Sequence, residues 1–360
     1  MTTSGLKGLV LSGGMGSRLR PFTYTGAKQL VPVANKPILF YAIEALVQAG
    51  VTEIGVITGD TGRQIREALG DGARFGAKLT FIPQEAPLGI AHAVKIAHDF
   101  LGDSRFVVFL GDNFLRGGIL PFVRAFEAAA PDAQILLTPV LNPREFGVAV
   151  LDDAGRPVRL VEKPPEPPTD LAIVGIYMFG PRFFQAVEEI TPSARGELEI
   201  TDTLQRLIDT GADVRAEIVR DSWIDTGKMG DLLAANRIVL EDLAPCTEGA
   251  TIEDSKLTGR VVLEPGARVV NSIIAGPAII GADTAVIDSY VGPYTSIYHH
   301  CRIVETEIEA SVVLERSTIE HPGSRIHESL IGRDVSITAV TARPKALRLV
   351  LGDHSNIQVP

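Results

Sequence analysis

Residues 8–37 read GLVLSGGMGSRLRPFTYTGAKQLVPVANKP, and this stretch decides the fold and the chemistry that we expect of the chain. Residues 8–11 are a short apolar run that predicts a strand, and the glycine-rich residues 12–16 follow it directly. Three cations come next: Arg18, Arg20 and Lys28. Glycines let backbone N–H groups approach an anion, and cations neutralise its charge. The stretch therefore suggests a phosphate-binding loop at the end of a strand.

The loop fits neither of the two common phosphate-binding patterns. The Walker pattern requires Gly, four residues and then Gly-Lys-Ser/Thr, and no such string follows Gly13. The dinucleotide pattern GxGxxG is met at Gly14 and Gly16 but has Leu19 where the third glycine is needed. A tight turn with solvated arginines explains a lone glycine-rich stretch equally well. The function of the loop therefore depends on what the rest of the chain provides.

Length, composition and charge limit the class of protein. A chain of 360 residues is long for one hydrophobic core, and its 45% hydrophobic and 22% charged residues are ordinary for a globular protein. The net charge of −10 argues against binding to nucleic acid or to an anionic membrane. Only Cys246 and Cys301 are present, which indicates neither a disulfide framework nor a zinc site. We expect a cytoplasmic protein without a signal peptide or membrane span.

Residues 8–240 alternate short β-branched runs with amphipathic stretches, which predicts an α/β fold. We expect a Rossmann-like, mostly parallel sheet with helices on both faces. The predicted strands are residues 8–11, 53–58, 78–82, 106–110, 135–140, 147–151, 158–162, 172–179 and 214–219. The predicted helices are residues 38–49, 64–69, 89–100, 181–190, 201–210 and 228–241. Ligands of such sheets bind beyond the carboxyl ends of strands, where the glycine-rich loop and Asp112 both lie.

Beyond about residue 250, apolar residues recur every six positions, a period that neither a helix nor a flat strand has. The repeat comprises Ile273, Ile279, Ala285, Val291, Ile297, Ile303, Val313, Ile319 and Ile331. Together with glycine and proline near the corners, this period predicts a parallel β-helix of hexapeptide repeats with about five coils. We therefore expect one domain at residues 1–245, a β-helix domain at residues 246–345 and a tail at residues 346–360.

Two acidic residues stand where a metal ion could be held. Asp112 follows the apolar strand at residues 106–110, and Asp225 lies in the later turn WIDTG at residues 223–227. Mg²⁺ takes one or two protein carboxylates and leaves the rest of its shell to phosphate and water. Two such residues could therefore clamp one ion against a triphosphate. A strand-ending turn at Asp112 and a helix N-cap at Asp225 are the alternatives that the sequence leaves open.

Other polar residues follow further strands. Glu162 and Lys163 end an apolar strand, where Lys163 could bind the phosphate of a second substrate and Glu162 its hydroxyl groups. A surface ion pair gives the same pattern. Gln84 carries the paired donor and acceptor that can read the edge of a base, with a solvated glutamine as the alternative. Gly147 and Gly175 mark either a close approach to a ligand or packing inside strands.

Taken in order, these motifs resemble the signature of the sugar-phosphate nucleotidylyltransferases, most closely the members that use dTTP and glucose 1-phosphate. The matches cover nearly all of residues 5–240: LSGGMGSRLRP at 11–21, Lys28, PV at 32–33, KP at 36–37, QEAPLG at 84–89, LGDN at 110–113, FGV at 146–148, EKP at 162–164, VGIY at 174–177, RGELEITD at 195–202 and WIDTG at 223–227. The hexad repeat resembles that of the longer members, which carry a left-handed β-helix. His92, Phe146 and residues 85–87 depart from the pattern of the short members, beside the expected base and sugar sites.

The resemblance implies that a sugar 1-phosphate oxygen attacks the α-phosphorus of dTTP, which gives a dTDP-sugar for activated-sugar biosynthesis and releases pyrophosphate. It implies catalytic roles for Arg18, Lys28, Asp112, Lys163 and Asp225, with Mg²⁺ on Asp112 and Asp225. The nucleotide would contact Leu11, Gly13, Gly14, Gly16, Ser17, Arg18, Lys28, Gln84, Gly89 and Asp112. The sugar phosphate would contact Gly147, Glu162, Lys163, Val174 and Tyr177. The implied partners are these small molecules and, through the β-helix, further copies of the chain.

Three other functions fit parts of the sequence. UTP could replace dTTP as the nucleotide. A histidine of the β-helix could be the base of an acyltransferase, the candidates being His299, His300, His321 and His327. A non-catalytic regulatory protein of the same architecture is the third, but it would be expected to have lost catalytic cations or carboxylates that this chain retains.

Overall fold

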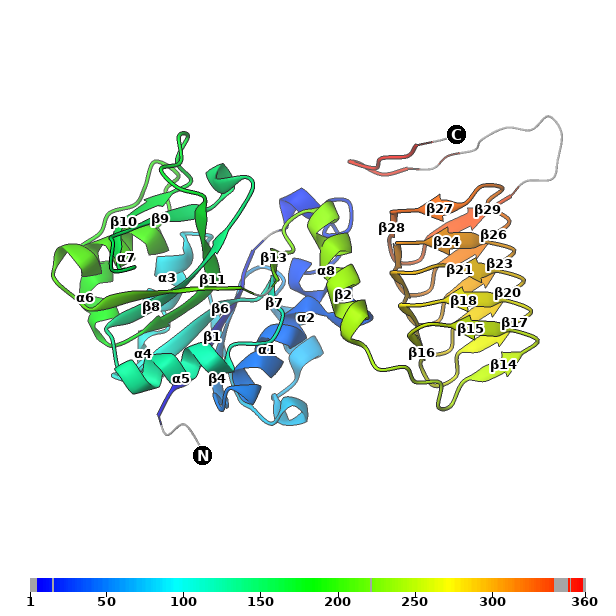
Figure 1. Cartoon of the computed structure of the whole chain (residues 1–360), viewed down its shortest axis with the longest axis horizontal. Helices are drawn as coiled ribbons and strands as arrows, with labels where there is room; N and C mark the ends of the chain where they lie inside the picture. The colour runs from blue at the N-terminus through cyan, green and yellow to red at the C-terminus, as the bar shows by residue number, and fades with distance from the viewer. Residues whose placement is uncertain (1–4, 15, 221, 340–348, 350, 359–360) are drawn as a thin grey trace. The chain divides into compact units, whose positions relative to one another are not determined.

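The structure, a computed structural model, describes residues 5–14, 16–220, 222–339, 349 and 351–358. It divides into two compact units (Figure 1). The first comprises Met1–Met15, Gly26–Leu30 and Ile38–Asp225, and the second comprises Gly16–Thr25, Val31–Pro37 and Thr226–Pro360. The domain boundary expected at residue 245 stays a prediction, because the compact units place α8 (Met229–Asp242) in the second unit. The expected tail at residues 346–360 lies partly outside the described residues.

The first unit is built on a nine-stranded sheet, as the alternating pattern predicts. Its strands are β1 (Lys7–Ser12), β4 (Glu53–Thr58), β5 (Lys78–Pro83), β6 (Phe106–Leu110), β8 (Ala133–Pro139), β9 (Gly147–Leu151), β10 (Pro157–Glu162), β11 (Leu171–Phe179) and β12 (Val214–Ile218). They run in the order β10-β9-β11-β6-β1-β4-β5, and β8 joins β11 to β12. β1 is parallel to both β4 and β6. The carboxyl ends of these three strands therefore meet at one edge.

Helices cover both faces of this sheet, because successive residues of each strand point to opposite sides. Leu9 and Val10 of β1 are both fully buried, yet they belong to different hydrophobic clusters. One cluster lies under α1 (Ile38–Gln48), α2 (Gly62–Leu69) and α5 (Leu120–Ala129). The other lies under α3 (Ile90–Lys95), α4 (His98–Leu101), α6 (Arg182–Glu188) and α7 (Ile200–Asp209). The Rossmann-like α/β fold expected from the sequence is therefore confirmed.

The short elements of the chain were the ones that the sequence pattern did not resolve. Four are 3-10 helices: η1 (Ser17–Leu19), η2 (Lys28–Leu30), η3 (Ala73–Phe75) and η4 (Pro143–Glu145). Two small antiparallel pairs join β2 (Pro32–Val33) to β3 (Lys36–Pro37), and β7 (Asn113–Leu115) to β13 (Trp223–Asp225). The single helix expected over residues 89–100 is two helices, and α5 was not expected. Among the described residues, no helix has both the length and the apolar character needed to cross a membrane.

Beyond α8, the chain winds through three parallel sheets, and this arrangement is consistent with a left-handed β-helix (Figure 1). One sheet contains β14 (Thr251–Glu253), β17 (Arg268–Val270), β20 (Ala285–Ile287), β23 (Arg302–Val304), β26 (Thr318–Glu320) and β29 (Ser336–Thr338). The second contains β15 (Lys256–Thr258), β18 (Ile273–Ala275), β21 (Tyr290–Val291), β24 (Glu307–Glu309) and β27 (Ile326–His327). The third contains β16 (Val261–Leu263), β19 (Ala278–Ile280), β22 (Thr295–Ile297), β25 (Val312–Val313) and β28 (Leu330–Ile331).

The register expected for the hexad repeat was wrong in places. Ile273 was expected inside the β-helix but is 46% exposed, and its neighbour Ile274 is fully buried. The reason is the length of a coil: Arg268 pairs with Ala285, and Ala285 pairs with Arg302, so most coils advance 17 residues. One side of each such coil is one residue shorter than a hexad. A strict six-residue count therefore drifts off the inward positions.

A column of buried hydroxyl groups connects successive coils at the same point of the 17-residue repeat. The backbone N–H of Ser272 donates to Oγ of Ser255 at 3.0 Å, and that of Ser289 donates to Oγ of Ser272 at 3.0 Å. The N–H of Thr306 donates to Oγ of Ser289 at 3.1 Å. These bonds satisfy backbone donors where the chain turns between sheets. The column stabilises the β-helix independently of its apolar interior.

Candidate active site

The glycine-rich loop begins where β1 ends, between the ends of β4 and β6. The hydroxyl of Ser12 donates to the carbonyl of Ile57 at 2.7 Å, which fixes the last residue of β1. Gly13 then runs so close to Gly59 that a Cβ built on Gly59 would lie 2.7 Å from the Gly13 carbonyl oxygen. Leu11 accepts a hydrogen bond from the N–H of Gly111 at 2.8 Å. The expected nucleotide residues Leu11, Gly13 and Gly14 thus lie at the carboxyl edge of the sheet.

Gln84 and Gly89, the expected base-binding residues, lie beside this loop. A Cβ on Gly13 would be 3.5 Å from Oε1 of Gln84, and Nε2 of Gln84 donates to the carbonyl of Gly89 at 3.3 Å. Gly89 has φ 102°, and a Cβ there would be 2.4 Å from the carbonyl oxygen of Leu198, so only glycine fits. His92 Nδ1 lies 3.1 Å from Nε2 of Gln84. Burial, helped by Lys95, lowers the pKa of His92, which favours the neutral ring that can accept this hydrogen bond.

Asp112 follows β6 and forms an ion pair with Lys28 of η2. The two side chains are 19% and 7% exposed, so the pair is largely shielded from water. Burial acts to raise the pKa of Asp112, but the charge and hydrogen bond of Lys28, with a hydrogen bond from Asn113, hold this pKa below its usual value. The carboxylate is therefore charged near neutral pH. Lys28 occupies the place of a counter-cation, as expected for a carboxylate that can also bind a metal ion.

Asp225 is brought to Asp112 by a strand pair that the sequence pattern did not predict. Asp225 is the last residue of β13 and pairs across the small sheet with Asn113, the residue after Asp112. The indole Nε1 of Trp223 donates to Oδ1 of Asn113 at 2.7 Å and braces the pair. Asp225 ends a strand and does not cap a helix. The structure therefore places the two expected metal ligands on neighbouring chain segments.

No larger metal cage is present, since the described residues contain no group of three or more His, Cys, Asp or Glu side chains positioned to hold an ion. A pair of carboxylates is nevertheless the donor set that suits Mg²⁺, which binds few protein ligands and keeps the others for phosphate and water. The residues present therefore fit a hard divalent cation that is shared with a phosphate substrate.

Glu162 and Lys163 lie at the end of β10, where Glu162 pairs with Gly147 of β9. A Cβ on Gly147 would lie 2.7 Å from Cγ2 of Thr201 and 3.1 Å from Oε2 of Glu162, so a side chain here would displace the carboxylate. Thr201 donates its hydroxyl to the same Oε2 at 3.3 Å. Lys163 has φ 41°, and its ammonium lies 3.6 Å from Oε1 of Glu162. This geometry holds a carboxylate and an exposed cation side by side.

Two charged residues complete this group and were quoted in the sequence motif without a role. Arg195 lies 3.2 Å from Oε1 of Glu162 and 2.8 Å from Oε2 of Glu199, with its guanidinium 39% exposed. Burial raises the pKa of Glu162, Lys163 lowers it, and Glu199 raises it, so the net pKa lies above the usual glutamate value. The run RGELEITD was the available signal, because it places Arg195 and Glu199 four residues apart.

Tyr177 and Val174 lie on β11, and only Tyr177 presents its side chain to the charged residues. Burial raises the pKa of the Tyr177 hydroxyl, as do the nearby carboxylates of Glu162 and Asp225. The expected sugar and metal residues are therefore close to one another. Val174 is fully buried in the hydrophobic core, so its backbone alone is available to a ligand. A Cβ on Gly175 would be 2.6 Å from Oδ1 of Asn113, which makes Gly175 a packing glycine.

Gln29 is a further residue that sequence reasoning did not single out. Its side chain is 2% exposed, and its Nε2 lies 3.5 Å from the position of a Cβ on Gly14. Its buried Oε1 makes no hydrogen bond within the described part of the chain. A buried acceptor without a donor is costly. Gln29 is therefore placed to bind a ligand at the glycine-rich loop, and its position beside Lys28 was the only signal in the sequence.

The remaining nucleotide residues, Gly16, Ser17 and Arg18, belong to the second unit. Gly16 has φ 64°, a left-handed conformation that suits glycine, and its carbonyl accepts the hydroxyl of Thr23 at 2.6 Å. Ser17 begins η1, and Arg18 is the exposed residue at its centre. The turn therefore holds Arg18 on a short, defined helix.

The four histidines considered for acyl transfer lie on turns and strands of the β-helix. Each lies near a carboxylate: His299 at 3.1 Å from Glu264, His300 at 3.7 Å from Asp283, His321 at 2.9 Å from Glu305 and His327 at 3.6 Å from Glu309. His299 Nδ1 also accepts the backbone N–H of Ala282 at 3.1 Å. These contacts explain the histidines as surface partners of acidic residues.

Known proteins confirm the class that the fold and the site define. A family model described as nucleotidyl transferase matches residues 7–242, and the chain belongs to this family. The glucose-1-phosphate thymidylyltransferases of Streptomyces griseus and Streptomyces antibioticus are 52% and 54% identical to it, each over 98% of this chain and 99% of their own. The low-salt glycan biosynthesis nucleotidyltransferase Agl11 of Haloferax volcanii is 48% identical over 98% of this chain and 100% of its own.

Solved structures agree on the fold of the first part of the chain. A crystal structure from Bacillus anthracis, provisionally named a glucose-1-phosphate thymidylyltransferase and complexed with sucrose, is 37% identical with a TM-score of 0.62. It covers 66% of this chain and 96% of its own. A UDP-glucose pyrophosphorylase complexed with UDP-glucose has a TM-score of 0.60 over 66% of this chain and all of its own, and at 22% identity it supports the fold alone.

Proposed function

We propose that the chain transfers a thymidylyl group from dTTP to glucose 1-phosphate, giving dTDP-glucose and pyrophosphate. The observation that carries this proposal is the meeting of Asp112, Asp225 and Lys28 at the sheet edge, with Tyr177 linking them electrostatically to Glu162. Such a site can hold two polyanions next to each other. The choice of dTTP and glucose 1-phosphate is supported by the two Streptomyces relatives, which match nearly the whole chain.

In this reaction a phosphate oxygen of glucose 1-phosphate attacks the α-phosphorus of dTTP in line, and the bond from that phosphorus to the bridging oxygen of the β-phosphate breaks. The electron pair leaves with pyrophosphate. The attacking oxygen is already anionic at neutral pH, so no general base is needed. The demands on the protein are alignment and the stabilisation of negative charge.

We assign each charge of the site one part of that task. Arg18 and Lys28 bind the triphosphate and stabilise the leaving pyrophosphate, and the exposed ammonium of Lys163 aligns the sugar phosphate. Leu11, Gly13, Gly14, Gly16 and Ser17 supply the loop backbone, and Gln84 and Gly89 meet the thymine. Glu162 accepts hydrogen bonds from sugar hydroxyls beside Gly147, Tyr177 and the backbone of Val174. Arg195 adds a second cation to this end of the site.

Asp112 and Asp225 are the residues that we propose hold a divalent cation, with Mg²⁺ the ion that suits two carboxylates and a polyphosphate. When bound, the ion neutralises phosphate charge that would otherwise repel the incoming sugar phosphate. Without it, Lys28 is the cation that Asp112 contacts. Because such substrates are made and kept in the cytoplasm, we propose a cytoplasmic location, with self-association through the β-helix.

Glu162 provides a test of the sugar site through its pH dependence. Because its folded pKa lies above the usual value, its charge is lost as pH falls through that raised pKa. We expect the KM for glucose 1-phosphate to rise about 10-fold in Glu162→Gln and to lose part of its rise at acid pH. The measurement is this KM between pH 5 and pH 8. The phosphate group itself titrates near pH 6 in both proteins, so only the difference between them counts, and identical profiles would contradict the assignment.

The proposed function is tested by one panel of assays. Pyrophosphate release is measured for dTTP and for UTP, each with glucose 1-phosphate, galactose 1-phosphate and mannose 1-phosphate. We expect the largest kcat/KM for dTTP with glucose 1-phosphate. A larger value for UTP would overturn the nucleotide assignment, and acetyl transfer from acetyl-CoA would show the histidines of the β-helix to be catalytic.

A further inference from the structure

The β-helix and α8 hold two segments that come from the N-terminal part of the chain. These segments are Gly16–Thr25, which contains Arg18, and Val31–Pro37, which follows Lys28 by three residues. Both therefore adjoin a cation that we place on the triphosphate. Their contacts within the second unit are partly apolar and partly polar.

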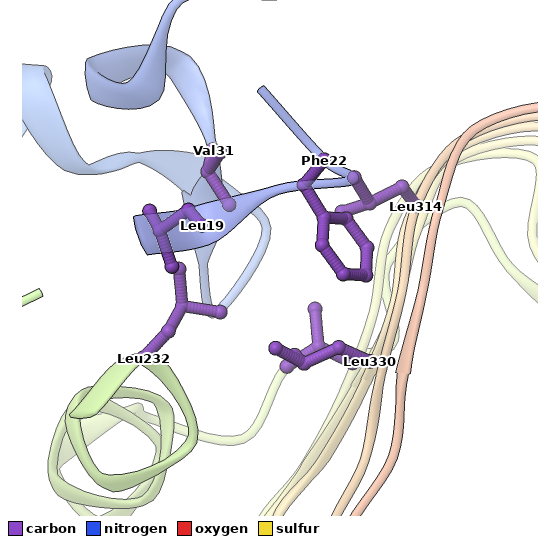
Figure 2. A pocket seen from close by; sticks show the side chains of 7 residues that line it. Leu19, Phe22, Val31, Leu232, Leu314 and Leu330 are labelled. Atoms are coloured by element: carbon purple, nitrogen blue, oxygen red, sulfur yellow. The ribbon is translucent and has the colours of Figure 1, made fainter. Parts of the chain in front are cut away.

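The apolar contact lies directly after Arg18. Figure 2 shows Leu19, Phe22 and Val31 pointing toward Leu232 of α8 and toward Leu314 and Leu330 of the β-helix. Leu19 is 1% exposed. The space left among these side chains is about 10 Å³, close to the volume that one water molecule needs. The segment that carries Arg18 is thus packed onto the outer face of the sheet formed by β16, β19, β22, β25 and β28.

The polar contact is centred on Asn236 of α8, which is fully buried. Its Oδ1 accepts the backbone N–H of Ala34 at 2.8 Å and the hydroxyl of Ser296 at 2.7 Å. Its Nδ2 donates to the carbonyl of Tyr294 at 3.1 Å. One carboxamide therefore joins the turn between β2 and β3 to the β-helix. A parallel bond runs from Nδ2 of Asn35 to the carbonyl of Ile297, at 2.9 Å.

The turn held in this way has an unfavourable backbone conformation. Ala34 and Asn35 have φ of 46° and 57°, the left-handed region that residues other than glycine rarely adopt. Such conformations persist where surrounding contacts determine them. Here those contacts are the hydrogen bonds of Asn236 and Asn35, and both connect to the β-helix.

We propose that Asn236 is a positioning residue for nucleotidyl transfer, through which the β-helix fixes the hairpin after Lys28 and so the geometry of the triphosphate site. This inference rests on the proposed function. The chain leaves η2 at Leu30, enters the hairpin at once and begins α1 at Ile38. A hairpin without its buried anchor moves relative to both ends, and displacements of about 1 Å cost much of the rate in an aligned reaction. The β-helix then contributes to catalysis as well as to assembly.

Three variants separate positioning from stability. Asn236→Ala removes the whole anchor, and Asn35→Gly removes one hydrogen bond but keeps a residue that readily adopts positive φ. Ser289→Ala is the matched control, because it deletes a buried hydroxyl of the ladder with Ser272 and Thr306. For each we would measure Tm and the KM values for dTTP and glucose 1-phosphate at saturating co-substrate.

We expect all three variants to lower Tm, but only Asn236→Ala and Asn35→Gly to raise the KM for dTTP, by about 10-fold and about threefold. The KM for glucose 1-phosphate should stay within about twofold of wild type. The inference is overturned if both variants leave the KM for dTTP at the level of the Ser289→Ala control. If Asn236→Ala does not fold, Asn35→Gly decides the question. A wild-type protein that turns over no nucleotide would instead refute the proposed function.

Discussion

Asp112→Asn is expected to lower pyrophosphate release by about 10²–10³-fold, the range found when one group that stabilises transition-state charge is removed. The substitution keeps the shape of the side chain but replaces a carboxylate oxygen with an amide that cannot bind a cation in the same way. It also deprives Lys28 of its ion-pair partner. The measurement is kcat with dTTP and glucose 1-phosphate at saturating Mg²⁺, together with the far-ultraviolet circular dichroism spectrum.

A matched control removes a carboxylate that has no part in the site. Asp213 forms an exposed pair with Arg215, and both side chains are 48% exposed. Asp213→Asn should leave kcat unchanged, since exposed pairs contribute little. Turnover in Asp112→Asn equal to that of Asp213→Asn would refute the proposed metal site.

Lys28→Met is expected to give the second largest effect, because it acts on both turnover and stability. Removal of the cation should lower kcat/KM for dTTP about 10²-fold or more. It also leaves the carboxylate of Asp112 buried without its partner, and breaking a buried pair in this way costs about 3 kcal/mol in the free energy of unfolding. The side chain of Met matches the length of Lys, so the packing around residue 28 is kept.

The stability loss should depend on pH in a defined direction. In the wild type, the folded pKa of Asp112 is lowered, so its contribution is present above the unfolded pKa and is lost as pH falls through the folded pKa. In Lys28→Met the main cause of the lowering is gone and burial raises the pKa. The free energy of unfolding should then fall as pH rises through the usual aspartate range.

Thermal unfolding at pH 4 and pH 7 measures this difference. We expect Tm of Lys28→Met to lie further below that of wild type at pH 7 than at pH 4. Arg63→Met is the control, because Arg63 and Glu67 form a pair whose side chains are 90% and 63% exposed. An equal Tm difference at both pH values for Lys28→Met would contradict the buried ion pair.

The parts of the site that end long strands could be predicted from the sequence. Asp112 follows five apolar residues and Glu162 ends another apolar run, and a buried parallel strand places whatever follows it at the ligand edge of the sheet. Gly89 and Gln84 were placed by the same reasoning. Local patterns suffice there because the strand and the side chain that it positions are adjacent in the sequence.

The parts that depend on distant contacts could not be predicted. Asp225 reaches the site through a three-residue strand paired with β7, and so short a run carries no readable period. Asn236 contacts Ala34 across 202 residues of sequence. The β-helix register failed for a similar reason, since a coil of 17 residues differs from three hexads by one, and the error grows with each coil. Resemblance supplied the roles of the residues but not these contacts.

The central claim is that the chain joins a thymidylyl group to a sugar phosphate. The direct measurement is ³¹P NMR of a mixture of the protein, Mg²⁺, dTTP and glucose 1-phosphate, with inorganic pyrophosphatase added. We predict the loss of the glucose 1-phosphate signal and the appearance of two coupled signals of a diphosphate ester, with two equivalents of inorganic phosphate for each ester formed. Inorganic phosphate released while the glucose 1-phosphate signal stays unchanged would contradict the account, because it would show triphosphate hydrolysis without transfer.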